Sequence, residues 1–146
     1  MEWIYDDGGR SKYFRATDVS DCVCRAISIA AKKDYKEVYD LINKVAKSHR
    51  RSDSSARNGV SPKITREVME ILGWQWVPTM TIGSGCTVHL RSEELPNGRI
   101  IAKVSHHVVA VIDGVIHDIY DPSRDGDRCV YGYYYKKGCR YGKVQV

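Results

Sequence analysis

Hydrophobic positions in the first half of the chain recur at the spacing of helices. Valine, isoleucine, leucine and alanine fall three or four positions apart in three segments, as expected for helices with one buried face. The expected helix starts are Ser20 or Asp21 before Cys22, Asp34, and Ser61 followed by Pro62. Ser and Asp favour the N-cap position and Pro favours the first turn. The pattern therefore predicts three helices, the last of which stops at Gly73.

After Gly73 the pattern changes to alternation, which is typical of β-strands. The strands expected from it are residues 74–80, 86–90, 99–104, 106–113, 115–120 and 129–136. Asp113-Gly114 favours a two-residue hairpin turn, which sets residue 109 opposite 118 and residue 111 opposite 116. Helices first and strands second predict an α+β fold in which N-terminal helices pack on a C-terminal antiparallel sheet.

Size and composition narrow the class of protein. A chain of 146 residues fits a single domain over 1–146, and a hydrophobic content of 42% with a net charge of +5 argues against disorder. No apolar run approaches the roughly 18 residues of a membrane helix, and the start MEWIYDDGG lacks the pattern of a secretory signal. Five cysteines without zinc-type spacing favour a cytoplasmic protein with no bound metal.

Positive charge gathers in two stretches. Residues 44–57 contain five Lys or Arg against one Asp, and residues 128–146 contain five and no acid. Either stretch can be a solvated surface or a basic face for an acidic partner, nucleic acid included, because tyrosines interleave the second stretch. The candidate binding residues there are Lys136, Lys137, Arg140 and Lys143. We expect no membrane partner.

One cysteine lies where a thiol becomes reactive. Cys22 is predicted at the start of a helix, where the helix dipole and free backbone N–H groups favour the thiolate and can also hold an oxyanion. Cys24, two positions on, points to another side of that helix. His107 opens the strand HVVAVIDG and is the candidate base, because a strand holds an imidazole rigidly.

Two acids compete to orient His107. The hairpin register places Asp118 on the same face as His107, diagonally across the strand pair. Asp121 is three residues further on, precedes Pro122, and reaches His107 only if the strand stops early or bulges. The sequence favours Asp118 and keeps Asp121 as the alternative. A Cys nucleophile, a His base and an Asp that orients the His together make a catalytic triad.

The segments DCVCRAISIA and HHVVAVIDGVIHDIYDPSR, followed by RCVYGYYY, resemble the papain-like cysteine peptidase superfamily in its small bacterial and phage forms. The resemblance covers about residues 20–135. It implies a papain-like fold in which Cys22 is the nucleophile, His107 the base and Asp118 the orienting acid. Bacteriocin-processing peptidases of the superfamily use an Asp-Pro pair, which would correspond to Asp121.

The resemblance implies cleavage of an amide or isopeptide bond in a protein or peptide, or acyl transfer, without a metal or organic cofactor. A phage protein of this type would act in the host cytoplasm. The chain departs from the superfamily because YFRATDVSD, before Cys22, contains no Gln or Asn, so Thr17, Ser20 or a backbone N–H would hold the oxyanion. The alternative is a non-catalytic basic protein on the same fold that binds and inhibits a host defence or nucleic-acid enzyme.

Overall fold

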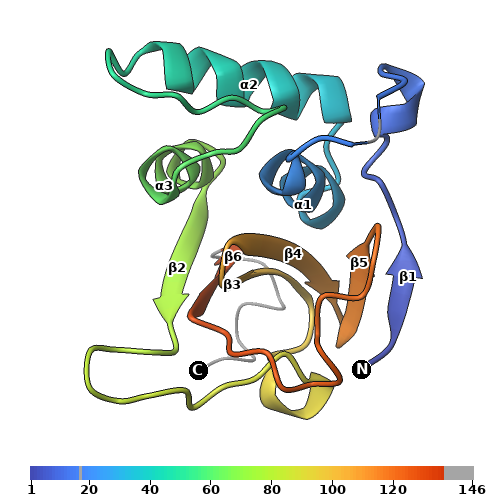
Figure 1. The fold of residues 1–146 in the computed structure, drawn as a ribbon, viewed down its shortest axis with the longest axis vertical. Helices are drawn as coiled ribbons and strands as arrows, with labels where there is room; N and C mark the ends of the chain where they lie inside the picture. Colours follow the sequence, from blue (N-terminus) through green and yellow to red (C-terminus); the bar gives the residue numbers. More distant parts are fainter. Residues whose placement is uncertain (17, 137–146) are drawn as a thin grey trace.

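The computed structural model describes residues 1–16 and 18–136. Within them, a layer of helices covers one face of a curved β-sheet (Figure 1). The helices are α1 (Cys22–Ala30), α2 (Tyr35–Lys47) and α3 (Pro62–Ile71), with short 3-10 helices η1 (Arg10–Lys12) and η2 (Ser92–Glu94). The strands are β1 (Trp3–Tyr5), β2 (Trp74–Pro78), β3 (Arg99–Val104), β4 (His107–Ile112), β5 (Val115–Asp118) and β6 (Gly132–Lys136).

The helices begin where the sequence predicts. The Asp34 carboxylate accepts the backbone N–H of Glu37 at 3.3 Å and caps α2. Ser61 caps α3 in the same way, accepting the N–H of Ile64 at 3.3 Å. Asp21 occupies the cap position of α1, but its side chain makes no capping hydrogen bond. The first turn of α1 therefore keeps backbone N–H groups that no capping side chain satisfies.

The sheet has the order β1-β5-β4-β3-β6-β2. Five strands pair antiparallel, but β1 pairs parallel to β5, so the sheet is mixed and the prediction of a purely antiparallel sheet is wrong. A three-residue strand with exposed side chains has no buried alternation that could reveal it. Residues 86–90 do not form the expected strand. They contribute one isolated antiparallel β-bridge, between His89 and Cys129. The predicted hairpin register is confirmed, with Val111 opposite Ile116.

Hydrophobic side chains fill both sides of the sheet. Val108 and Ala110 of β4 pack against the helices, whereas Val109 and Val111 pack on the opposite face in a second cluster. Burial on both faces makes β4 a central strand that carries no solvent-facing side. His107 begins this strand, and its backbone is held by pairing with Val104 of β3.

Cys86 and Cys129 form a disulfide, with their Cα atoms 5.8 Å apart. The bond joins the loop after β2 to the segment before β6. The sequence interpretation of a cytoplasmic cysteine set did not include it, because pairing between residues 43 positions apart cannot be deduced from spacing. Cys22 and Cys24 are free thiols. No helix in the described part of the chain is long and apolar enough to cross a membrane.

Candidate active site

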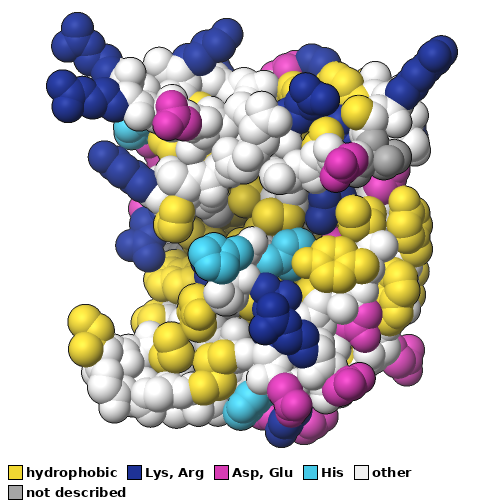
Figure 2. Space-filling model, viewed as in Figure 1, with side chains coloured by type: hydrophobic (Ala, Val, Ile, Leu, Met, Phe, Trp, Pro, Cys, Tyr) yellow, Lys and Arg dark blue, Asp and Glu magenta, His cyan; other side chains and the backbone are white. Residues whose placement is uncertain are grey.

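Cys22 is the first residue of α1 and lines a cleft of about 780 Å³ between the helices and the sheet. Ser20 and Val23 lie beside it in the wall, and His106, His107 and Val108 come from the turn before β4 and from β4 itself. The space-filling view shows a hollow between the two layers, with histidine side chains at its mouth (Figure 2). The thiol is thus half-buried and open to a ligand in the cleft.

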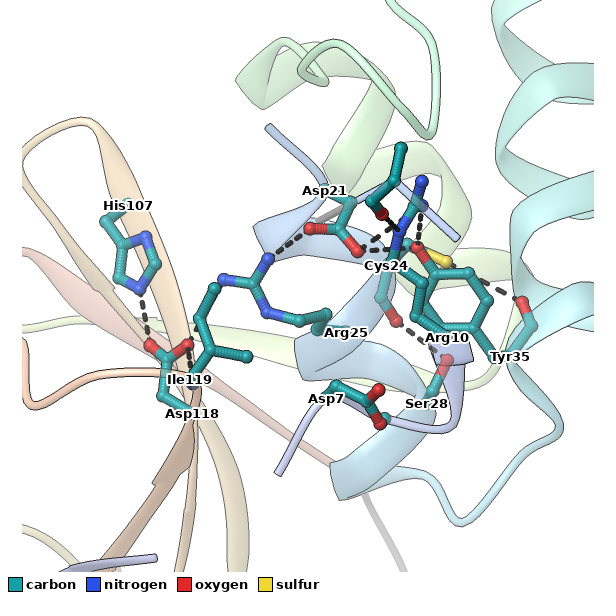
Figure 3. Close-up of polar contacts among 12 residues, drawn as sticks. Asp7, Arg10, Asp21, Cys24, Arg25, Ser28, Tyr35, His107, Asp118 and Ile119 are labelled. Carbon is teal, nitrogen blue, oxygen red and sulfur yellow. Dashed lines mark hydrogen bonds and ion pairs between the residues drawn. The ribbon is translucent and has the colours of Figure 1, made fainter. Parts of the chain in front are cut away.

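His107 connects the thiol to a carboxylate. Its Nε2 lies 2.7 Å from Oδ2 of Asp118, and both side chains are buried (Figure 3). This contact leaves the other ring nitrogen for Cys22, and the two side chains are close enough that each shifts the pKa of the other. His107 starts β4 and Asp118 ends β5, so the hairpin register sets their separation. The structure therefore brings Cys22, His107 and Asp118 into one continuous line of contacts.

The environment favours a thiolate beside an imidazolium. Burial alone would raise the pKa of Cys22, but the hydrogen bond and charge of His107, the N–H of Val108 and the charge of Arg25 together lower it below 9.0. Burial alone would lower the pKa of His107, but Asp118 and Cys22 raise it above 6.5. The two shifts are reciprocal, because each group stabilises the charged form of the other. Such a pair is primed for nucleophilic attack.

The structure separates the two competing acids. Asp118 is 3% exposed and contacts His107, whereas Asp121 is exposed and accepts the backbone N–H of Ser123 at 2.9 Å. That bond makes Asp121 part of the turn around Pro122. Of the two carboxylates, the one predicted first from the hairpin register is the one that contacts the imidazole.

Sequence reasoning missed a buried charged network behind these residues. Arg25, one turn after Cys22 on α1, donates from Nη2 to Oδ1 of Asp118 at 3.1 Å and from Nη1 to Asp21. Tyr35 donates its hydroxyl to Asp21 at 2.5 Å and accepts from Arg10 Nη1 at 2.8 Å (Figure 3). The spacing of Asp21 and Arg25, four residues apart on a helix otherwise apolar on this side, is the one sequence signal that could have revealed it.

This network links the helix start to the strand acid. The two positive charges of the network balance its two negative charges. The four charged residues, each at most 5% exposed, are Arg10, Arg25, Asp21 and Asp118. Arg25 and the backbone N–H of Ile119 donate to Oδ1 of Asp118 while His107 contacts Oδ2, so the carboxylate is held by three partners. The Asp21 carboxylate accepts hydrogen bonds from Arg25 and Tyr35 and therefore does not cap α1. The first-turn N–H groups next to Cys22 remain the donors that an oxyanion would use.

The other oxyanion candidates are limited. The backbone N–H of Ser20 donates to the carbonyl of Arg57 at 2.9 Å, so only its hydroxyl is left to face the cleft. Thr17 lies outside the described residues. Of the four basic candidates near the C-terminus, Lys136 ends β6 and is exposed, while Lys137, Arg140 and Lys143 also lie outside the described residues.

Within residues 1–16 and 18–136, no group of three or more His, Cys, Asp or Glu side chains is arranged to hold a metal ion. Comparison of the chain with models of known protein families, with curated proteins and with solved structures finds no match.

Proposed function

We propose that this protein is a cysteine hydrolase of the papain-like type that cleaves an amide or isopeptide bond in a protein or peptide. The observation that carries the proposal is the line of contacts from Cys22 through His107 to Asp118 at the wall of a cleft. Each group has the position that its role requires: an accessible thiol, a rigid imidazole and a buried carboxylate that fixes the ring.

The reaction follows from the charge states of these groups. The thiolate of Cys22 attacks the carbonyl carbon, a C–S bond forms, and the N–H groups at the start of α1 stabilise the oxyanion. His107 gives its proton to the leaving nitrogen as the C–N bond breaks, which leaves a thioester. His107 then takes a proton from water, the resulting hydroxide attacks the thioester, and the C–S bond breaks to restore thiolate and imidazolium. An amine in place of water gives acyl transfer.

Asp118 acts through His107. It accepts a hydrogen bond from Nε2, fixes the tautomer that presents the other nitrogen to sulfur, and stabilises the imidazolium. Arg25 positions Asp118 in turn. This division makes Cys22 and His107 the catalytic residues and Asp118 and Arg25 positioning residues.

Covalent trapping tests the proposal. Exposure to a panel of acyl and ubiquitin-like electrophilic probes, followed by intact-mass and peptide mapping, should place a single adduct on Cys22. Cys22→Ala and His107→Gln should abolish or strongly slow the adduct, and Cys24→Ala, the matched control on the same helix, should not. Adducts on Cys24, or equal labelling in His107→Gln, would reject the mechanism.

A second candidate function is a basic binding protein on the same fold that performs no chemistry. The observation that favours it is the stretch before Cys22, in which residues 13–21 contain no Gln or Asn to assist the oxyanion. This candidate predicts a Cys22 that reacts no faster than a free thiol. The trapping experiment therefore decides between the two.

We place the activity in the cytoplasm, that of the host if the chain is encoded by a phage. The Cys86–Cys129 disulfide is the observation against this location, because the cytosol keeps most thiols reduced. Differential alkylation in freshly prepared cell extract, before and after a reductant, measures the state of this pair. A fully oxidised pair would move the proposed activity to an oxidising compartment.

A further inference from the structure

Three cationic side chains surround the cleft that contains Cys22. Lys63 and Arg66 lie one turn apart on α3, and Lys103 lies on β3. Among the described residues that line the cleft, none is Asp or Glu. Because an apolar, half-enclosed wall weakens solvent screening, these charges create a positive potential beside the thiol.

Arg66 is held in place at the cleft. Its guanidinium lies over the ring of Trp76, 5.8 Å from the centroid, and is close enough to the hydroxyl of Tyr134 to oppose the rise in that group's pKa that burial causes. The rings of Trp76 and Tyr134 are themselves in contact, with centroids 4.9 Å apart. A guanidinium fixed in this way loses little freedom when it binds a carboxylate, and its fork matches the two carboxylate oxygens.

The positive surface continues beyond the cleft. A second, more open hollow of about 620 Å³ shares Gly59 and Lys63 with it and is also lined by Arg50 and Arg51, against one acid, Asp53. Figure 2 shows Lys and Arg side chains gathered over the end of α2 and over α3. Arg50 and Arg51 of the basic stretch at residues 44–57 thus line a hollow that adjoins the cleft containing Cys22.

The cleft fits a polypeptide better than a nucleic acid. Single-stranded nucleic acid stacks its bases on open aromatic faces. Trp76 does not offer one, because Gly132 lies against its ring so closely that a Cβ there would be 2.3 Å away, and Arg66 lies over it. A polypeptide supplies both the carbonyl that a thiolate attacks and the carboxylates that the cations attract.

We propose that the cleft selects polypeptides with Asp or Glu side chains close to the bond that Cys22 attacks, and that Lys63, Arg66 and Lys103 bind those carboxylates. This inference rests on the proposed function for the identity of the reacting thiol. The preference for acidic polypeptides can be measured without any turnover. The charge selection and the proposed hydrolase activity can therefore fail separately.

Small alkylating agents measure the potential at the thiol. The probe pair is iodoacetate, which is anionic, and iodoacetamide, which is neutral, with the rate at Cys22 followed by peptide mapping. The rate with iodoacetate divided by the rate with iodoacetamide should be about tenfold lower at low salt in K63Q/R66Q/K103Q than in the unsubstituted protein. The control K12Q/K33Q/K36Q removes the same net charge outside the cleft lining and should leave the ratio unchanged. Because Lys103 is half-buried, K63Q/R66Q is measured as well and should give a smaller fall in the same direction.

Peptide binding completes the test. A fluorescent peptide rich in Glu should bind the Cys22→Ala variant at least tenfold more tightly than its Gln counterpart, and the difference should disappear in the cleft triple variant. An unchanged alkylation ratio, or tighter binding of a single-stranded oligonucleotide than of the Glu peptide, would overturn the inference and leave the proposed function intact. A slow Cys22 thiol combined with charge-selective peptide binding would reject the hydrolase and keep the acidic-peptide site.

Discussion

Two cysteines separated by one residue at the start of α1 lie in opposite environments. Cys22 lines the cleft, and despite its burial the contacts with His107 and the N–H of Val108 lower its pKa. Cys24 is fully buried, its sulfur lies 3.6 Å from the carbonyl oxygen of Tyr35, and burial raises its pKa to about 12. Both thiols occupy the first turn of one helix, so the helix dipole cannot account for the difference. The difference comes from burial, which dominates at Cys24, and from His107 and the N–H of Val108, which outweigh burial at Cys22.

The two cysteines mark two regions that meet at the start of α1. The reactive side consists of Cys22 and His107, which line the cleft, and of Asp118, which contacts His107. The buried side consists of Arg10, Asp21, Cys24 and Tyr35, and it closes the space between η1, α1 and α2. Arg25 contacts an acid on each side and joins them. We therefore expect chemistry to depend on the first region, stability on the second, and both on Arg25.

The largest expected difference is between the two thiols. At neutral pH, alkylation of Cys22 by iodoacetamide should exceed that of Cys24 by about a thousandfold or more, because Cys22 has more thiolate and is accessible. Peptide mapping after timed quenching measures both rates. The Cys22 rate should rise with pH through a midpoint below 9.0, and His107→Gln should move that midpoint upward. Equal labelling of the two thiols would show that Cys22 and Cys24 do not differ in reactivity, and the prediction would be wrong.

The next effect concerns the acid of the reactive side. Asp118→Asn should reduce turnover by about a thousandfold, because an amide can leave His107 in the wrong tautomer and no longer stabilises the imidazolium. Asp121→Asn, the matched control three residues away, should change turnover by less than about threefold, since Asp121 contacts only the turn. The comparison uses steady-state hydrolysis of whichever probe acylates Cys22. The reverse ranking would make Asp121 the orienting acid.

Much of the reactive side could be predicted from the sequence, for a local reason. The cap residues place Cys22 at a helix start, and the Asp113-Gly114 turn sets the register that brings Asp118 diagonally opposite His107. Both signals are local, since His107 and Asp118 are only 11 residues apart and the turn between their strands has two residues. The α+β layering followed from the same local patterns.

Apart from the four-residue spacing of Asp21 and Arg25, the buried side left no signal in the sequence, because its other contacts join distant segments. Arg10 and Tyr35 are 25 residues apart, and Arg25 and Asp118 are 93 apart, so neither pair leaves a periodic signal. The parallel pairing of β1 with β5 and the Cys86–Cys129 disulfide were missed for the same reason. These features depend on how the layers pack, which a hydrophobic pattern does not encode.

Arg25 tests whether the two regions are coupled. Arg25→Met keeps much of the side-chain length but removes the cation that the buried carboxylates of Asp21 and Asp118 share. The free energy of unfolding should fall by about 3–5 kcal/mol, as for other broken buried ion pairs. The pKa of Cys22 should rise as well, since the charge of Arg25 helps to lower it. Urea unfolding and the pH profile of alkylation measure the two effects.

The control for that coupling is a surface pair. Lys36→Met removes the exposed contact with Asp40, on α2, and should cost less than about 1 kcal/mol and leave the thiol unaffected. If Arg25→Met destabilises the protein no more than Lys36→Met does, the buried network contributes little. If it destabilises the protein but leaves the Cys22 profile unchanged, Arg25 belongs to the buried side alone.

The smallest expected effect separates the two regions most clearly. Tyr35→Phe removes a hydroxyl that donates to Asp21 and accepts from Arg10, but Arg10 Nη1 already lies 3.7 Å from Asp21 and can close that gap. The free energy of unfolding should therefore fall by only about 1–2 kcal/mol. Cys22 contacts neither group, so its alkylation rate should stay within experimental error of the unsubstituted protein. Tyr39→Phe, on a ring packed 6.1 Å from Tyr35, controls for the loss of a hydroxyl in the same cluster. A Cys22 rate that falls together with stability in Tyr35→Phe would show that the buried side sets the thiol's reactivity, and the division into two regions would then be wrong.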